Sequence, residues 1–237
     1  KAISNSSGEI IGHLNTDDIY LPGTFKAVLD AFNSNDDVDM VCGSAELVSE
    51  IEGGKWQIKE HFDALTHAKL TWPLVLKGAI LTNARFYRRG FLMQCGPFDE
   101  TYKLIADREF LIKALELRPR TIPVESTVLH YRQHADSLTF NEDLNAMKKG
   151  FLEKVRLAKQ KYEAAEAVSI EAKRYAEWGQ YEASLGFINS LKQFSFPSLF
   201  YFYSEGQKFG PGWFKYLTSS LLHKGFDKIH NLVRNKK

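Results

Sequence analysis

The sequence predicts an α/β fold with a mixed, mostly parallel sheet flanked by helices, followed by an α-helical C-terminal region. Two observations predict this fold class. Residues 9–42 have the pattern of a strand, an acidic loop, an amphipathic helix and a second strand, which is the order that builds an α/β layer. From Asn141 onward the pattern changes to long helical stripes. We therefore expect two domains, residues 1–140 and 141–237.

The first elements follow from local hydrophobic spacing. Residues 9–14 are apolar and rich in β-branched side chains, which indicates a buried strand that ends at the polar segment 15–18. Residues 21–23 (LPG) form a turn, and apolar residues recur at helical spacing from Thr24, a candidate N-cap. Residues 38–42 predict the second strand. Ligands bind beyond the carboxyl ends of strands in such sheets. The segment 15–18 follows such a strand end, so it is a candidate ligand-binding segment.

The middle of the chain is less regular. We predict helices over residues 64–76, 88–94 and 107–117, and strands over residues 80–87 and 126–131. Beyond the boundary near residue 140, helical patterns extend to Leu191 and again from Phe214 to Val233.

Composition excludes several classes of protein. The chain has 237 residues, of which 44% are hydrophobic, enough for a buried core, and its formal net charge is only +2. That charge leaves no global excess for nucleic acid phosphates, so we expect no nucleic acid partner. Cys42 and Cys95 lie in apolar surroundings without disulfide or metal-ligand spacing, which favours a reducing compartment. No apolar run suits a membrane span or signal peptide, so we expect a cytoplasmic protein.

Asp17 and Asp18 are the first candidate site. Two carboxylates at a strand end can hold Mn²⁺ or Mg²⁺, while the remaining coordination positions take water and phosphate oxygens. A bound metal ion would stabilise the charge that develops on a departing diphosphate. The alternative is an Asp-rich turn whose carboxylates cap backbone N–H groups, and spacing alone does not separate the two interpretations.

Two further segments carry candidate residues. Asp107 precedes a helical pattern, where a carboxylate could accept a proton from an attacking hydroxyl or could simply cap the helix. In the polar loop after residue 131, Arg132 could bind a phosphate and His134 could ligate a metal or donate to a diphosphate, although a solvated loop would look similar. His13 and His130 lie within strand patterns and are interpreted as structural.

Four segments together carry a resemblance to a known family. They are residues 7–23 (SGEIIGHLNTDDIYLPG), 83–89 (NARFYRR), 96–111, which include GPFDE and ADREFL, and 131–139 (YRQHADSLT). In content and order they resemble the inverting glycosyltransferases of family 2, which have a GT-A fold. The first segment is specific, and the other three gain weight from following in the family's order.

The resemblance implies roles for the candidate residues. Asn15, Asp17 and Asp18 match the D-x-D region, where one carboxylate ligates Mn²⁺ or Mg²⁺ and another group contacts the ribose or diphosphate of the donor. Asn15 replaces the commoner Asp and offers no charge, so we favour Asp17 as the main ligand.

The third and fourth matched segments, residues 96–111 and 131–139, imply the catalytic base and a closing loop. Asp107 matches the catalytic base, which deprotonates the acceptor hydroxyl. Arg132 and His134 match the loop that closes over the diphosphate in similar enzymes.

The beginning of the chain departs from the family. Residues 1–8 have the pattern of a helix end with its glycine stop, whereas family members begin with a strand and loop that hold the nucleotide base. The resemblance therefore implies a truncated sheet and an incomplete donor-base pocket. We expect this chain alone to transfer sugar weakly or not at all.

The expected activity is transfer of a sugar from a nucleotide-diphosphate sugar to a glycan or lipid-linked acceptor, as in bacterial polysaccharide assembly. A sugar-nucleotide nucleotidyltransferase and a non-catalytic scaffold with the same fold are the alternatives. Aromatic residues between Phe194 and Tyr216, followed by basic residues up to Lys237, suggest peripheral contact with the inner face of a membrane. Core packing is the alternative explanation for these aromatic residues.

Overall fold

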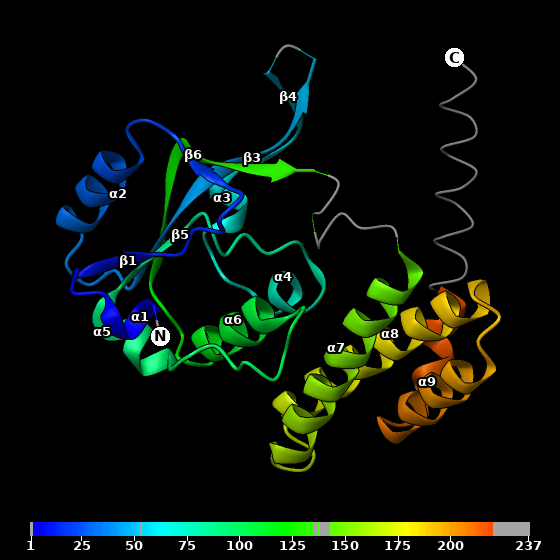
Figure 1. Ribbon diagram of the computed structural model, residues 1–237. Helices are drawn as coiled ribbons and strands as arrows, with labels where there is room; N and C mark the ends of the chain where they lie inside the picture. The colour runs from blue at the N-terminus through cyan, green and yellow to red at the C-terminus, as the bar shows by residue number, and fades with distance from the viewer. Residues whose placement is uncertain (1, 53, 135–136, 138–142, 220–237) are drawn as a thin grey trace. The chain divides into compact units, whose positions relative to one another are not determined.

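The computed structural model describes residues 2–52, 54–134, 137 and 143–219 (Figure 1). The chain divides into two compact units, residues 1–140 (unit 1) and residues 141–237 (unit 2), at the position where the hydrophobic pattern changes. Unit 1 contains a sheet with helices, and unit 2 is helical. The predicted α/β class is confirmed for unit 1.

Unit 1 is built around a mixed sheet that has six strands in the described residues. The strand order is β1 (Ile10–Gly12), β5 (Arg85–Arg88), β3 (Met40–Ile51), β6 (Thr121–Gln133) and β2 (Ile19–Tyr20), and β4 (Lys55–Phe62) pairs with β3. Of the pairs between these strands, β3–β6 is parallel and the other four are antiparallel. The prediction of a mostly parallel sheet is therefore wrong.

The strand direction was predicted wrongly because a buried apolar run indicates burial and does not indicate whether the strand is parallel or antiparallel. Residues 40–45 of β3 are buried, which gives the continuous apolar pattern of a parallel strand. That pattern reports burial on both faces, whereas strand direction depends on the connections. β4 follows β3 in a hairpin, which requires antiparallel pairing, and β5 returns antiparallel on the other side of β3. The strand β4 was not predicted, because most of its residues are exposed.

The first helix of unit 1 after the short α1 (Ala2–Asn5) is α2 (Thr24–Asn33), as predicted from residue 24. Its N-cap is Gly23, whose φ of 86° lies in the left-handed region that glycine adopts without strain, so the expectation of Thr24 as N-cap is wrong. Instead, the Thr24 hydroxyl donates a hydrogen bond to the Val128 carbonyl at 3.0 Å, which ties the helix to β6.

The predicted helix over residues 64–76 is in fact two helices, α3 (Ala64–His67) and α4 (Trp72–Lys77). A new N-cap separates them, because the Thr71 hydroxyl accepts a hydrogen bond from the Leu74 N–H at 3.4 Å and Pro73 is tolerated in a first turn. The other predicted helices are confirmed as α5 (Arg89–Cys95) and α6 (Ala106–Glu116). The predicted strand over residues 80–87 is reduced to β5, whereas β6 is longer than the predicted 126–131.

The core of unit 1 joins α2 to the sheet through Val28 and Phe32, which pack with Leu47 of β3 and Leu129 of β6. At the centre of the sheet the strands approach closely at Gly43, where an added Cβ would lie 2.4 Å from Val128 methyl carbons. The core therefore fixes β3 and β6 side by side over much of their length, and this pair determines where the end of β6 lies.

Unit 2 contains α7 (Leu144–Ala164), α8 (Ile170–Lys192) and α9 (Phe196–Lys208), followed by helical residues 213–219. Helix α8 packs against both α7 and α9 (Figure 1). Two glycines on α8 allow α9 and the residue after it to approach, since an added Cβ would lie 2.4 Å from the Phe209 ring at Gly179 and 2.3 Å from the Phe202 ring at Gly186. Among the helices of the described residues, none is long and apolar enough to cross a membrane.

Candidate functional site

The carboxylate of Asp18 joins three segments of unit 1. It lies in the loop between β1 and β2 and is 6% exposed. Its Oδ2 accepts hydrogen bonds from the Asn83 side-chain amide at 2.6 Å and from the Asn15 amide at 3.3 Å. Its Oδ1 accepts a hydrogen bond from the backbone N–H of Arg132, near the end of β6, at 3.0 Å. Asp18 therefore holds the acidic loop, the segment before β5 and the end of β6 together.

Asp17 is the more accessible of the two carboxylates. Its Oδ2 lies 2.9 Å from Nε2 of His134, and the side chain of each residue is 36% exposed. The His134 backbone N–H donates to the Ser137 hydroxyl at 3.0 Å, and that hydroxyl donates to the Arg132 carbonyl at 3.4 Å. These two bonds connect the Ser137 hydroxyl to the backbone at the end of β6, next to the His134 ring that contacts Asp17.

The acidic segment 15–18 has features of both interpretations, the Asp-rich turn and the ligand-binding site. A turn is present, because the Asp18 N–H donates to the Asn15 carbonyl at 3.2 Å. The Asp18 carboxylate, however, accepts a backbone hydrogen bond from residue 132, which is distant in sequence. The structure brings together five of the six predicted site residues around this segment: Asn15, Asp17, Asp18, Arg132 and His134.

The two carboxylates have pKa values shifted in opposite directions. Burial raises the pKa of Asp18, and its hydrogen bonds from Arg132, Asn83 and Asn15 oppose this shift. The hydrogen bond with His134 lowers the pKa of Asp17. The pair thus combines a buried carboxylate that organises the loop with an accessible carboxylate that keeps its charge.

We expect Asp18 to take up a proton before Asp17 when the pH is lowered. Folding raises the pKa of Asp18 above 3.8, so its protonation in the folded protein begins at a higher pH than in the unfolded chain. Folding lowers the pKa of Asp17, so its charge stabilises the fold above pH 3.8, and this contribution is lost as the pH falls through the lowered pKa. Carboxyl ¹³C resonances, assigned with Asp18→Asn, would give both midpoints, and the reverse order would contradict the assignment.

Arg132 is held at this site by a residue that the sequence did not indicate. Its guanidinium lies over the ring of Trp56 of β4, 5.1 Å from the ring centroid. The Arg132 Nε is buried and has no hydrogen-bond partner in the described structure. Beside the Trp56 ring lies that of His130, whose Nε2 is 3.2 Å from Glu46 Oε2. His130 thus has its own partner on β3, and its interpretation as a structural residue stays a prediction.

Asn83 is the second residue whose role the sequence did not reveal. It belongs to one of the segments that carry the family resemblance, yet a polar residue shortly after the apolar run 79–81 gives no sign of its partner. Only the pairing of β5 with β1 and β3 brings it to the acidic loop. The sequence gave no indication that Trp56 belongs to the site, because Trp56 lies in an exposed hairpin that was not predicted.

Asp107 lies in the first turn of α6, half-buried, and its Oδ1 accepts a hydrogen bond from the Arg108 backbone N–H at 2.7 Å. The N-cap of α6 is Ile105, so Asp107 is not the N-cap residue. Three residues further on, the Phe110 ring lies 6.0 Å from the His13 ring, centroid to centroid. His13 is two residues before Asn15, so the start of α6 lies beside the segment that leads into the acidic loop.

The geometry of Asp17 and His134 fits a divalent cation. Two neighbouring ligands of an octahedral ion at about 2.1 Å each are about 3 Å apart, close to the 2.9 Å between Asp17 Oδ2 and His134 Nε2. Both oxygens of Asp18 already accept hydrogen bonds, which favours Asp17 over Asp18 as the ligand. No larger group of His, Cys, Asp or Glu with metal-binding geometry occurs in the residues that the structure describes. The protein would therefore supply two ligands, as is usual where phosphate oxygens and water complete the shell.

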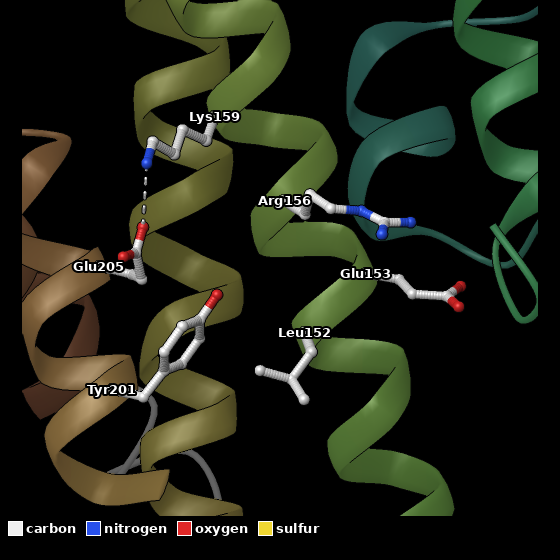
Figure 2. Close-up of a pocket in the computed structure, with 6 residues that line it drawn as sticks. All are labelled: Leu152, Glu153, Arg156, Lys159, Tyr201 and Glu205. Atoms are coloured by element: carbon white, nitrogen blue, oxygen red, sulfur yellow. Dashed lines mark ion pairs between the residues drawn. The ribbon is translucent and has the colours of Figure 1, made fainter. Parts of the chain in front are cut away.

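A separate hollow lies in unit 2 between α7 and α9, with a volume of about 260 Å³ (Figure 2). It is lined by Leu152, Glu153, Arg156, Lys159, Tyr201 and Glu205. The Lys159 ammonium lies 3.8 Å from the Glu205 carboxylate, and that carboxylate also pairs with Lys208. The charge of Glu205 is thus already compensated by the protein's own lysines.

No protein-family model matches the chain, and no curated protein matches it.

Proposed function

We propose that this chain is the catalytic portion of an inverting glycosyltransferase with a GT-A-like fold. It transfers a sugar from a nucleotide-diphosphate sugar to a hydroxyl of a glycan or lipid-linked acceptor. One observation supports the proposal most. Asn15, Asp17 and Asp18 meet Arg132 and His134 at one site, although 114 residues separate Asp18 from Arg132. Residues that the sequence predicts to bind the donor diphosphate are thus neighbours in the fold.

The donor diphosphate would bind at the accessible side of this cluster. Asp17 and His134 would hold Mn²⁺ or Mg²⁺, which when bound neutralises the charge that develops on the departing β-phosphate. The guanidinium of Arg132 carries a permanent positive charge and a fork of N–H donors suited to phosphate oxygens, and Trp56 limits its movement. Asp18 does not contact the donor in this scheme. It positions the loop that carries Asp17.

Asp107 would act as the general base. Its carboxylate accepts the proton of the acceptor hydroxyl as the hydroxyl oxygen attacks the anomeric carbon. The new glycosidic bond forms on the face opposite the nucleotide, the bond between the anomeric carbon and the diphosphate oxygen breaks, and the nucleoside diphosphate leaves with the electron pair. Helix α6 suits this role because its first turns lie beside His13, at the entry to the acidic loop.

Binding of nucleoside diphosphates tests the donor site without requiring turnover. We expect calorimetry with a panel of nucleoside diphosphates to detect binding that depends on Mn²⁺. Asp17→Asn should weaken this binding by about 10–100-fold, because an amide offers the cation no charge. Asp36→Asn, which changes an exposed carboxylate in the loop after α2, is the matched control and should bind like the unmodified chain. Equal binding by Asp17→Asn, or no binding of any nucleotide with any divalent cation, would contradict the proposed donor site.

A further inference from the structure

Five aromatic residues of unit 2 form an exposed surface, which we call the aromatic face: Phe194, Phe196, Phe200, Tyr203 and Phe214. Phe196, Phe200 and Tyr203 follow one another at intervals of four and three residues, so they share one side of α9. Phe194, in the turn before α9, is 84% exposed, and Phe196 and Phe200 are 76% and 75% exposed. The Tyr203 ring contacts the buried Trp213 ring, which contacts Phe214, so Phe214 continues the same surface.

In the part of unit 2 that the structure describes, α9 packs on α8 through side chains other than those of the aromatic face. The opposite side of α9 makes this contact, because Phe202 is buried and packs against Gly186 of α8. Phe209, just after α9, is buried against Gly179 in the same way. Large aromatic side chains that stay exposed beside a complete core mark a binding surface, since isolated exposed residues need no explanation but a contiguous group does.

The charge around the aromatic face is positive. The described residues 191–219 contain three lysines, Lys192, Lys208 and Lys215, against one acidic residue, Glu205. Glu205 is buried and paired with Lys159 and Lys208. Lys192 and Lys215 are exposed and lie close in sequence to Phe194 and Phe214. The face therefore combines exposed aromatic rings with an excess of positive charge.

We propose that the aromatic face binds the surface of an anionic lipid bilayer. The phenylalanine rings enter the boundary between headgroups and acyl chains, and the lysines contact the anionic headgroups. A second copy of the chain fits less well, because a symmetric dimer through this face would place the same positive charges opposite one another. One partner, the bilayer, thus accounts for both the exposed rings and the exposed lysines beside them. The proposal does not depend on the chemistry of unit 1.

Vesicle co-sedimentation with the full chain tests this proposal. We expect binding to vesicles of equal parts phosphatidylglycerol and phosphatidylcholine at low salt, at least about tenfold weaker binding to phosphatidylcholine alone, and loss of binding near 0.5 M salt. Phe196→Ser combined with Phe200→Ser should reduce binding by at least about tenfold, because two rings no longer enter the bilayer. Lys192→Glu combined with Lys215→Glu should reduce it similarly, and only for anionic vesicles.

Phe25→Ser is the matched control, because Phe25 is 64% exposed but lies on α2 of unit 1. It should leave vesicle binding unchanged, and circular dichroism at 222 nm should show that every variant keeps its helices. Absence of binding to anionic vesicles would overturn the proposal, as would an equal loss with Phe25→Ser. A dimer of the unmodified chain in analytical ultracentrifugation that Phe196→Ser and Phe200→Ser dissociate would also overturn it, because the face would then be a contact between two copies.

Discussion

Replacement of Trp178 by alanine is expected to lower the free energy of unfolding by about 3–5 kcal/mol. Trp178 lies in α8, is fully buried and, with Trp213, is one of the two largest such side chains in the described structure. Its indole N–H donates to Oε1 of Glu182 at 3.1 Å. Glu182 is itself buried and its carboxylate lies 3.4 Å from the Lys154 ammonium of α7. Alanine would therefore leave a cavity and remove a hydrogen bond from a buried carboxylate, and both effects destabilise unit 2.

Urea denaturation followed by circular dichroism would measure this loss without relying on tryptophan fluorescence. Trp178→Phe is the informative control, because it keeps a six-membered ring in the core while it removes the hydrogen bond, which contributes about 1 kcal/mol, and part of the buried volume. Its loss of stability should therefore be smaller than that of Trp178→Ala. If Trp178→Ala were no less stable than Trp178→Phe, the indole would not fill the centre of unit 2. A loss confined to the transition of unit 2 would further support the division of the chain into two units.

Replacement of Asp107 by asparagine is expected to lower the rate of sugar transfer by about 10²–10⁴-fold. Asparagine has nearly the same shape as aspartate but cannot accept the proton of the acceptor hydroxyl. Binding of the nucleoside diphosphate should remain within about twofold, because a general base acts in the transition state and not on the bound donor. Transfer would be measured in single-turnover experiments with excess protein, using the nucleotide sugar whose nucleoside diphosphate binds in the Mn²⁺-dependent assay.

The matched control for this variant is again Asp36→Asn. Measurable transfer by the unmodified chain that Asp107→Asn does not slow would remove Asp107 from the catalytic machinery. Weaker donor binding together with an unchanged rate at saturation would indicate that Asp107 positions the donor. These two outcomes separate a proton acceptor from a residue that shapes the pocket.

Much of the site could be predicted from the sequence because its residues follow recognisable local elements. The short strand before Asn15 and the helix after Gly23 each have a clear hydrophobic pattern, so the acidic segment could be assigned to the loop between them. The pairing of Asp17 with His134 could be expected only from the family resemblance, because no local pattern relates residues 117 positions apart.

The remaining features of the fold depend on contacts between distant segments. The hairpin of β3 and β4 carries few buried residues beyond Leu47, so its sequence provided no strand signal strong enough for a prediction. Trp56, which fixes Arg132, was missed together with that hairpin. Antiparallel pairing of β5 with β3 is likewise decided by how residues 63–84 connect the strands, and hydrophobic periodicity does not report such a connection.

The three hydrogen bonds to the carboxylate of Asp18 have a consequence for the folding of the chain. Two of them close loops of 65 and 114 residues, so they form only after the entropy cost of bringing these segments together has been overcome. During synthesis the acidic loop emerges long before residue 132, and it stays unanchored until the last strand of unit 1 has docked. The proposed binding of a nucleoside diphosphate would therefore appear late in folding, and it could be used to report when unit 1 has reached its native topology.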